Sequence, residues 1–281
     1  MEAPVWFITG AASGFGHEIA VEALRRGGRV VATARDPSKI AISGENVLTL
    51  PLDVRDRDAI AAAVRAAEAR FGSVDVLVNN AGYGLIAAVE EATQDEIDAL
   101  IGTHFTGTLD LIRAVLPGMR SRRRGYILNF SSIAGFTGGA GTALYAAAKH
   151  GVEGLSEGLA KEVAPLGIKV SIVEPGPFQT QFFTSSRKMG ERRMPDYDAT
   201  AGAYRDRASK PDPWLPGDPA RGAAAVCDLV EMAEPPMRLL LGKFAHDIAL
   251  ASYSARIAEA ERFRDLTLGA DKPEAEGRPW P

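Results

Sequence analysis

Cysteine and histidine are scarce in this sequence of 281 residues. The one cysteine, Cys227, has no partner for a disulfide within the chain. It lies in the apolar stretch GAAAVCDLV, where we expect a small buried side chain. The four histidines, His17, His104, His150 and His246, show no metal-ligand spacing. The sequence therefore predicts neither a disulfide scaffold nor a metal site.

Long apolar runs and a marked excess of one charge are also missing. The first apolar run, VWFIT, is too short to span a bilayer and lacks a basic leader and a cleavage site. The net charge of −4 gives no general attraction to nucleic acid or to an anionic membrane. The densest basic cluster, RSRRRG at residues 120–125, is interpreted as a solvated helix C-terminus. We expect a cytoplasmic protein without a nucleic-acid or membrane partner.

The sequence does contain a regular alternation of short β-branched or aliphatic runs with longer alanine-rich stretches. Apolar residues make up 46% of the chain, as is typical of a globular protein with a sizeable core. Strands are predicted at residues 5–9, 30–34, 47–54, 74–80, 126–132, 169–175 and 238–242. Helices are predicted near residues 15–27, 56–70, 93–119, 143–165, 220–232 and 246–264. This pattern predicts an α/β fold with a doubly wound, seven-stranded parallel sheet and helices on both faces.

We expect a single domain over residues 1–265, followed by a flexible C-terminal tail over residues 266–281. Within the domain, residues 177–219 are too long for an ordinary connection, and such a segment is typical of a lid or binding loop. This segment is rich in proline and large apolar side chains: Pro177, Pro195, Pro211, Pro213, Pro216, Pro219, Phe182, Phe183, Met189, Met194, Tyr197, Tyr204 and Trp214. We therefore predict a substrate lid.

A glycine-rich turn, TGAASGFG, joins the first predicted strand to the first predicted helix. Gly10, Gly14 and Gly16 let the backbone bend sharply and approach a pyrophosphate, whose charge the helix N-terminus stabilises. Glycine also serves close packing of a helix on a strand, so the turn alone is weak evidence. Its position between a strand and a helix indicates nucleotide binding.

The second predicted strand ends at Arg35, where a site that prefers NAD would carry an acidic residue. A guanidinium at this position suits the 2′-phosphate of NADP, because it presents a planar fork of donors. Asp36 offers an alternative, since it can pair with Arg35 on the surface. The strand end favours NADP over NAD.

Ser132, Tyr145 and Lys149 form the candidate catalytic group. Tyr145 and Lys149 share one face of a helix, so the Lys149 ammonium can lie near the Tyr145 phenol. A free tyrosine titrates near ~10, and a neighbouring cation favours the ionised form, which brings the phenol into range for proton transfer. The position of this pair, after a strand that ends in two serines, makes the pattern specific.

These motifs resemble those of the short-chain dehydrogenase/reductase family, in the same order along the chain. TGAASGFG is similar to the family's glycine turn, NNAG at residues 79–82 to its fourth-strand motif, and YAAAK at residues 145–149 to its active-site motif. PGPFQT at residues 175–180 is similar to a further family segment, and the resemblance covers nearly all of residues 5–242. It implies a Rossmann-type fold and hydride transfer with NADP(H), while NAD(H) stays possible.

The resemblance also implies a role for each matched catalytic residue. Tyr145 would be the general acid in carbonyl reduction and the base in alcohol oxidation. Ser132 would hydrogen-bond the carbonyl or the developing alkoxide. Lys149 would lower the pKa of Tyr145 and hold the nicotinamide ribose.

By the same resemblance, Asp53 and Asn79 would face the adenine side of the cofactor and Thr180 the nicotinamide carboxamide. The glycine turn and the ends of the strands would supply the remaining contacts. The expected cofactor-binding residues are Gly10, Ser13, Gly14, Phe15, Gly16, Arg35, Asp53, Val54, Asn79, Ala81, Gly82, Tyr145, Lys149, Pro175, Gly176 and Thr180.

His104 departs from the family pattern, in which an asparagine usually holds a water that links the lysine to solvent. A neutral imidazole can accept at one nitrogen and donate at the other, so it can hold the same water. A pKa near neutrality would also give the relay a pH dependence. The alternative is a core histidine that only packs and hydrogen-bonds a backbone carbonyl.

The substrate is expected to be a medium-sized, largely apolar ketone, aldehyde or secondary alcohol, because the lid is rich in aromatic residues and methionine. A modest basic excess in residues 184–210 either favours an anionic substrate or reflects a solvated lid face. The basic residues there are Arg187, Lys188, Arg192, Arg193, Arg205, Arg207 and Lys210.

Two other functions stay open: a non-catalytic sensor that binds NADP(H), and an epimerase or dehydratase that uses the cofactor transiently. The turn spacing argues against the second, and the intact Ser132, Tyr145 and Lys149 argue against the first. The family resemblance also implies a homodimer or homotetramer.

Overall fold

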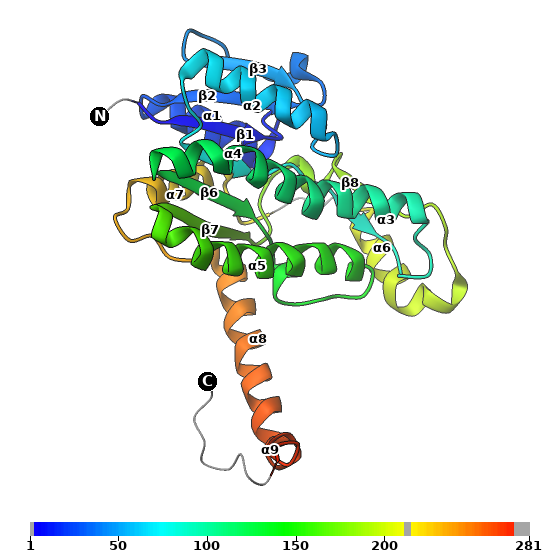
Figure 1. Ribbon diagram of the computed structural model, residues 1–281. Helices are drawn as coiled ribbons and strands as arrows, with labels where there is room; N and C mark the ends of the chain where they lie inside the picture. Colours follow the sequence, from blue (N-terminus) through cyan, green and yellow to red (C-terminus); the bar gives the residue numbers. More distant parts are fainter. Residues whose placement is uncertain (1–2, 211–214, 273–281) are drawn as a thin grey trace.

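Seven parallel strands form the central sheet of the computed structural model, which describes residues 3–210 and 215–272 (Figure 1). The chain order reverses between β1 and β4, and doubly wound sheets bind ligands at the carboxyl ends of the strands at such a point. The predicted doubly wound, seven-stranded parallel sheet is confirmed. Its spatial order is β3 (Val47–Pro51), β2 (Arg29–Ala34), β1 (Val5–Thr9), β4 (Val76–Asn79), β6 (Gly125–Phe130), β7 (Ile168–Pro175) and β9 (Arg238–Leu241).

Two apolar cores lie on opposite faces of the sheet, because successive strand residues point to opposite sides. Trp6 and Ile8 of β1 belong to one core, and Phe7 belongs to the other. Cys227 is fully buried in the first core, and burial raises the pKa of its thiol to about 12, so the expected small buried side chain is confirmed. The first core lies against α1 (Gly14–Arg25) and α7 (Pro219–Glu231), and the second against α2 (Arg57–Phe71), α4 (Gly107–Arg122) and α5 (Ala143–Val163).

The helix predicted over residues 93–119 is divided into three parts. A capping box of Thr93 and Glu96 starts α3 (Gln94–Ile101), a π-helical turn follows over Gly102–Thr106, and α4 completes the segment. A π-turn contains one residue more than an α-helical turn and is frequent at functional sites. His104 is the buried member of this turn.

The lid has its own secondary structure. In it, β8 (Arg187–Met189) pairs in parallel with β5 (Gly84–Ile86), which follows the fourth-strand motif, and α6 (Ala203–Ala208) follows β8 within the segment. The lid residues Pro211, Pro213 and Trp214 lie outside the described residues.

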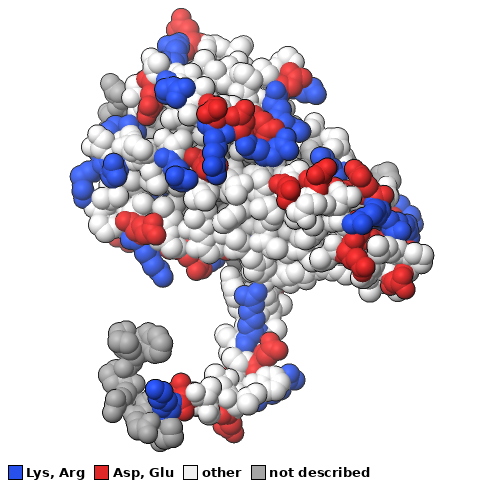
Figure 2. Space-filling model, turned by 45° about the vertical axis from the view of Figure 1, so that its right-hand side comes forward, with Lys and Arg blue, Asp and Glu red and all other residues white. Residues whose placement is uncertain are grey.

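Several lid arginines are engaged within the protein. Arg192 donates to the backbone carbonyl oxygens of Glu90 and Ala92, at 3.0 and 2.6 Å. Arg193 pairs with Asp198 and Asp206, each at 2.8 Å. Figure 2 accordingly shows blue and red side chains interspersed over the lid. Much of the basic excess therefore holds the lid together.

The C-terminal helix α8 (Lys243–Arg262) extends away from the sheet and is followed by α9 (Arg264–Leu268), as the orange and red segments of Figure 1 show. Arg256 of α8 donates to the carbonyl oxygen of Phe136 at 2.6 Å, whereas Leu266 of α9 is 77% exposed. The tail expected from residue 266 thus begins inside a helix, and residues 273–281 lie outside the described part.

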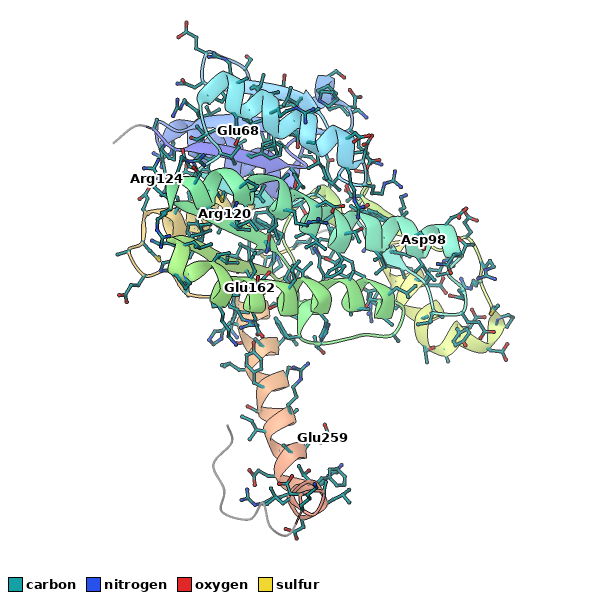
Figure 3. All side chains as sticks on the ribbon, viewed as in Figure 1. Glu68, Asp98, Arg120, Arg124, Glu162 and Glu259 are labelled. Atoms are coloured by element: carbon teal, nitrogen blue, oxygen red, sulfur yellow. The ribbon has the colours of Figure 1, made fainter. Side chains whose placement is uncertain are left out.

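The basic cluster lies at the end of α4 and directly before β6, away from the carboxyl ends of the strands. Arg122 donates to the carbonyl oxygen of Val74 at 2.9 Å, and Arg124 pairs with Asp75 at 3.2 Å. Figure 3 shows Arg120 and Arg124 on the side of the molecule opposite Asp98 of α3. The prediction of a helix C-terminus is confirmed. Within the described ranges, no helix is long and apolar enough to cross a membrane.

Candidate active site

The glycine turn after β1 leaves an open helix N-terminus. Gly10 and Gly14 have φ values of 69° and 55°, a backbone region that favours glycine. Ser13, the N-cap of α1, makes no side-chain hydrogen bond to the helix, so the first N–H groups stay available to an anion. A Cβ at Gly16 would overlap the carbonyl oxygen of Gly10 and lie 2.6 Å from Asn80 Nδ2. The turn therefore fits a pyrophosphate that approaches its backbone.

Two residues that the sequence reasoning missed support this turn. Asn80 Nδ2 donates to the carbonyl oxygen of Thr9 at 2.9 Å. The Thr9 hydroxyl accepts the backbone N–H groups of Asn80 and Ala81, both at 3.0 Å. Both residues lie within motifs that the sequence analysis quotes: Thr9 is the first residue of TGAASGFG, and Asn80 is the second residue of NNAG. Their membership of these motifs was the signal that could have identified them.

Arg35 is exposed at the end of β2, and among the described residues no carboxylate pairs with it. Asp36, the alternative partner, accepts instead from Ser38 and lies 3.7 Å from Lys39. Arg35 is thereby left to face a ligand at this strand end, and it lies close enough to Asp53 to lower the pKa of that carboxyl.

The residues expected at the adenine side differ in their placement. Asp53 accepts hydrogen bonds from the Arg55 side chain, the shortest of them at 2.6 Å, and these lower the pKa of Asp53. Asn79 is buried and donates from Nδ2 to Asn129 Oδ1 at 2.8 Å. The Asn79 side chain is thus engaged inside the sheet, whereas Asp53 stays near the surface. Val54 is a core residue, 7% exposed.

The segment that follows β7 lies beside the glycine turn. A Cβ placed on Gly14 would lie 3.4 Å from the Cβ of Thr180. Gly176, after Pro175 at the end of β7, donates to the carbonyl oxygen of Leu241 at 3.0 Å. The ring of Phe15 packs on Phe178, with ring centroids 4.8 Å apart, so only its backbone is left for a ligand.

Ser132, Tyr145 and Lys149 lie together at the carboxyl end of β6. Ser132 caps the short helix Ile133–Gly135, and its hydroxyl is hydrogen-bonded to Tyr145. Lys149 Nζ donates to the carbonyl oxygen of Phe130 at 2.7 Å and lies 5.7 Å from the centroid of the Tyr145 ring. Tyr145 and Lys149 are 8% and 5% exposed, so the group is shielded from water.

Burial dominates the acid–base behaviour of this group. It raises the pKa of the Tyr145 phenol above the ordinary value, while the hydrogen bond from Ser132 opposes the rise. Burial also lowers the pKa of Lys149 to about 7. The pKa of Tyr145 is thus raised by burial, and the lowering of this pKa by Lys149 stays a prediction. Both side chains are buried, and Lys149 Nζ is directed to a backbone carbonyl.

His104 is 2% exposed and lies beside the catalytic tyrosine, with ring centroids 5.3 Å apart and the rings edge to face. Its Nε2 lies 2.7 Å from the carbonyl oxygen of Tyr83, whereas its Nδ1 has no partner. Burial and the nearby Lys149 lower the pKa of His104 well below its ordinary value. The imidazole is therefore neutral at neutral pH, and the expected titration near neutrality is wrong.

Replacement of His104 by leucine is expected to destabilise the protein by about 1–3 kcal/mol, because the backbone of Tyr83 would lose a buried partner. His104→Asn should cost less and should leave the pH dependence of turnover near neutrality unchanged, since the imidazole it replaces is already neutral. Chemical denaturation and pH–rate profiles measure the two effects. A flatter profile in His104→Asn would show that His104 does titrate near neutrality.

The geometry defines a class of protein. A glycine turn at a helix N-terminus, an unpaired arginine at the end of β2 and a buried Ser–Tyr–Lys group all lie at the carboxyl edge of one doubly wound sheet. Such a sheet binds dinucleotides across this edge. In the described part of the chain, no group of three or more His, Cys, Asp or Glu side chains could hold a metal ion. The class is that of nucleotide-binding oxidoreductases.

Comparison with known proteins agrees with this class. The family model described as short chain dehydrogenase matches residues 4–191. Oxidoreductase BOA17 of Botryotinia fuckeliana is 36% identical over 95% of this chain and 98% of its own length. The 3-ketodihydrosphingosine reductase of Bacteroides thetaiotaomicron is 37% identical over 86% of this chain and 89% of its own length. The chain belongs to the short-chain dehydrogenase family.

Solved structures are similar over the whole fold. A short-chain dehydrogenase from Streptomyces avermitilis has a TM-score of 0.88 and 40% identity, covering 96% of this chain and 99% of that one. A short-chain dehydrogenase from Burkholderia cenocepacia in complex with NADP has a TM-score of 0.74 and 25% identity, covering 93% and 97%. The Rossmann-type fold inferred from the resemblance is therefore confirmed, and the protein is an enzyme of this family.

Proposed function

We propose that the protein is an NADP(H)-dependent oxidoreductase that interconverts a carbonyl compound and a secondary alcohol. The observation that carries the proposal is the buried Tyr145, hydrogen-bonded to Ser132 and one helical turn from Lys149. A bound nicotinamide supplies or accepts the hydride. The glycine turn, Arg35 and Thr180 are the groups of this chain that would hold the cofactor.

In carbonyl reduction, the Ser132 hydroxyl donates a hydrogen bond to the carbonyl oxygen, and Tyr145 gives its proton to the oxygen as negative charge develops there. The raised pKa keeps Tyr145 protonated at neutral pH, so the acid needed for reduction is present. In alcohol oxidation Tyr145 must take up the proton, and this direction is favoured as the pH rises. Lys149 stabilises the phenolate and binds the ribose.

His104 is proposed to serve the proton relay through Nδ1. This nitrogen is buried and without a partner, and its ring touches Tyr145. In the neutral imidazole it can accept or donate one hydrogen bond, depending on the tautomer. A relay that uses the neutral ring needs no titration of His104.

The preference for NADP(H) is proposed to depend on Arg35. Arg35→Ala is expected to raise the KM for NADPH by roughly 10- to 100-fold, because a charge-assisted hydrogen bond to the 2′-phosphate is lost. The KM for NADH should change by less than about twofold, since NADH lacks that phosphate. Arg65→Ala, at an exposed position on α2, is the control. A clear preference of the unaltered enzyme for NADH would contradict this role.

The substrate is proposed to be medium-sized and largely apolar. Tyr145 packs with the buried Leu85 and Leu100, and the lid places Phe182 against it with ring centroids 5.7 Å apart. A relative named as a reductase of a keto compound supports a ketone substrate. Such apolar walls around a few polar groups are typical of small-molecule sites.

A panel of ketones, aldehydes and secondary alcohols, assayed with NADPH and NADH side by side, tests the proposed function. Turnover of at least one apolar carbonyl compound is expected. Tight binding of NADPH without turnover of any compound would favour the non-catalytic sensor instead. Light scattering would test the proposed homo-oligomer, and cell fractionation would test the proposed cytoplasmic location.

A further inference from the structure

A buried acidic cluster lies one helical turn beyond the catalytic lysine. Glu153, one helical turn after Lys149 on α5, is 7% exposed, and Glu174 of β7 is fully buried. Arg238 of β9 reaches both carboxylates at 3.2 Å. One arginine therefore serves two buried carboxyl groups.

The buried polar groups of this cluster make few hydrogen bonds. Apart from the contacts with Arg238, the two carboxyl groups have each other as hydrogen-bond partner, and the buried hydroxyl of Ser131 has none among the described residues. Ser131 is 4% exposed and directly precedes the catalytic Ser132. A Cβ on Gly135 would overlap the Ser131 hydroxyl and lie 2.8 Å from Glu153 Oε1, so this glycine lets the two groups approach each other.

The proton in the cluster has a preferred position. Burial and the adjacent Glu153 carboxyl raise the pKa of Glu174 well above the ordinary carboxyl range, although Arg238 opposes the rise. Glu174 therefore favours its protonated form at neutral pH. From α8, Tyr253 also lies near the cluster.

The charge on Glu153 acts on Lys149. Residues four apart on a helix lie on one face, and both side chains are buried, where charges interact strongly. Burial lowers the pKa of Lys149, and Glu153 raises it. Without this carboxylate, the ammonium would have no nearby negative charge on its own helix.

We propose that Glu153, buried one helical turn from Lys149, is a positioning residue that keeps Lys149 in its ammonium form, and that Arg238 holds the Glu153 carboxyl group in place. This inference rests on the proposed function, in which the ammonium of Lys149 assists Tyr145. Arg238 also pairs with Glu157, and its side chain is 31% exposed, so it connects the buried cluster with the surface.

Glu153→Gln tests the proposal, because it removes the charge and keeps the size of the side chain. The pKa of Lys149 then falls, so the ammonium and the turnover that needs it are lost at a lower pH. We expect the alkaline limb of the reduction profile to move down by roughly one to two pH units, with turnover near the unaltered level only below about pH 5. A merely structural role would lower turnover equally at every pH, and that result would overturn the proposal.

Two matched variants serve as controls. Glu157→Gln removes a carboxylate that also pairs with Arg238 but is half-exposed, and it should leave the profile unchanged. Glu174→Gln should also leave it nearly unchanged, because Glu174 holds a proton already. If the alkaline limb moved as far in Glu174→Gln as in Glu153→Gln, the charge that acts on Lys149 would not belong to Glu153 in particular. That result would contradict the proposal.

A second measurement does not depend on turnover. NMR titration of isotope-labelled lysine side chains, with the Lys149 signal assigned by Lys149→Met, reports the ammonium directly. A Lys149 amine that is already neutral well below pH 7 in the unaltered protein overturns the proposal, even if Glu153→Gln fails to fold. Absence of any turnover in the unaltered enzyme would instead contradict the proposed function.

Discussion

Tyr145→Phe is expected to reduce turnover in both directions by at least about 10³-fold, because the phenol is the group proposed to give and take the proton. The phenylalanine ring fills the same space against Leu85, Leu100 and Phe182, so the fold should persist. Steady-state rates with the best substrate of the panel measure the effect.

The control for this variant is its affinity for NADPH, measured by fluorescence, together with its melting temperature. The melting temperature should stay close to that of the unaltered enzyme, and the affinity should fall by less than about tenfold, because the variant loses at most one hydrogen bond to the cofactor. Turnover within about tenfold of the unaltered enzyme would show that another group transfers the proton.

Gly16→Ala is expected to have the largest effect on cofactor binding. The new Cβ would overlap the carbonyl oxygen of Gly10 and press on the Asn80 amide, 2.6 Å away. The Gly10 atom is a backbone carbonyl oxygen, and the Asn80 side chain is held by its hydrogen bond to the Thr9 carbonyl oxygen, so moving either of them costs free energy. We expect a loss of about 1–3 kcal/mol in stability and a fall of more than about tenfold in NADPH affinity, measured by calorimetry.

Gly158→Ala in the middle of α5 is the matched control. Nothing lies within 4 Å of a Cβ built there, so alanine adds no contact. Because glycine is the weaker helix former, this variant should gain about 0.5–1 kcal/mol and keep the cofactor affinity. Equal losses in both variants would mean that the close approach at Gly16 is unimportant.

The sheet and the motif residues could be predicted because each rests on a local pattern. All seven strand runs are strands, and Ser132, Tyr145 and Lys149 are brought together as the helical spacing of YAAAK requires. The place of the candidate site in the fold was also predictable. In a parallel sheet the carboxyl ends of the strands, and the loops that follow them, lie at one edge.

Other features depend on contacts that no local pattern contains. The π-turn at His104 is compatible with the same apolar stripe as an α-helix, so the stripe could not reveal it. The pairing of β5 with β8 joins residues about a hundred positions apart. The pKa of Tyr145 depends on how completely the lid and α5 exclude water, which only the packed structure fixes.

The pairing of β5 with β8 also bears on the order of events during turnover. The short strand β5 follows NNAG, whose Asn80 buttresses the glycine turn, and the same segment holds the lid through β8. The cofactor site and the predicted lid are thus connected through one strand pairing. Thermodynamic linkage makes their coupling reciprocal: a substrate that closes the lid tightens the cofactor by the same factor by which the cofactor tightens the substrate.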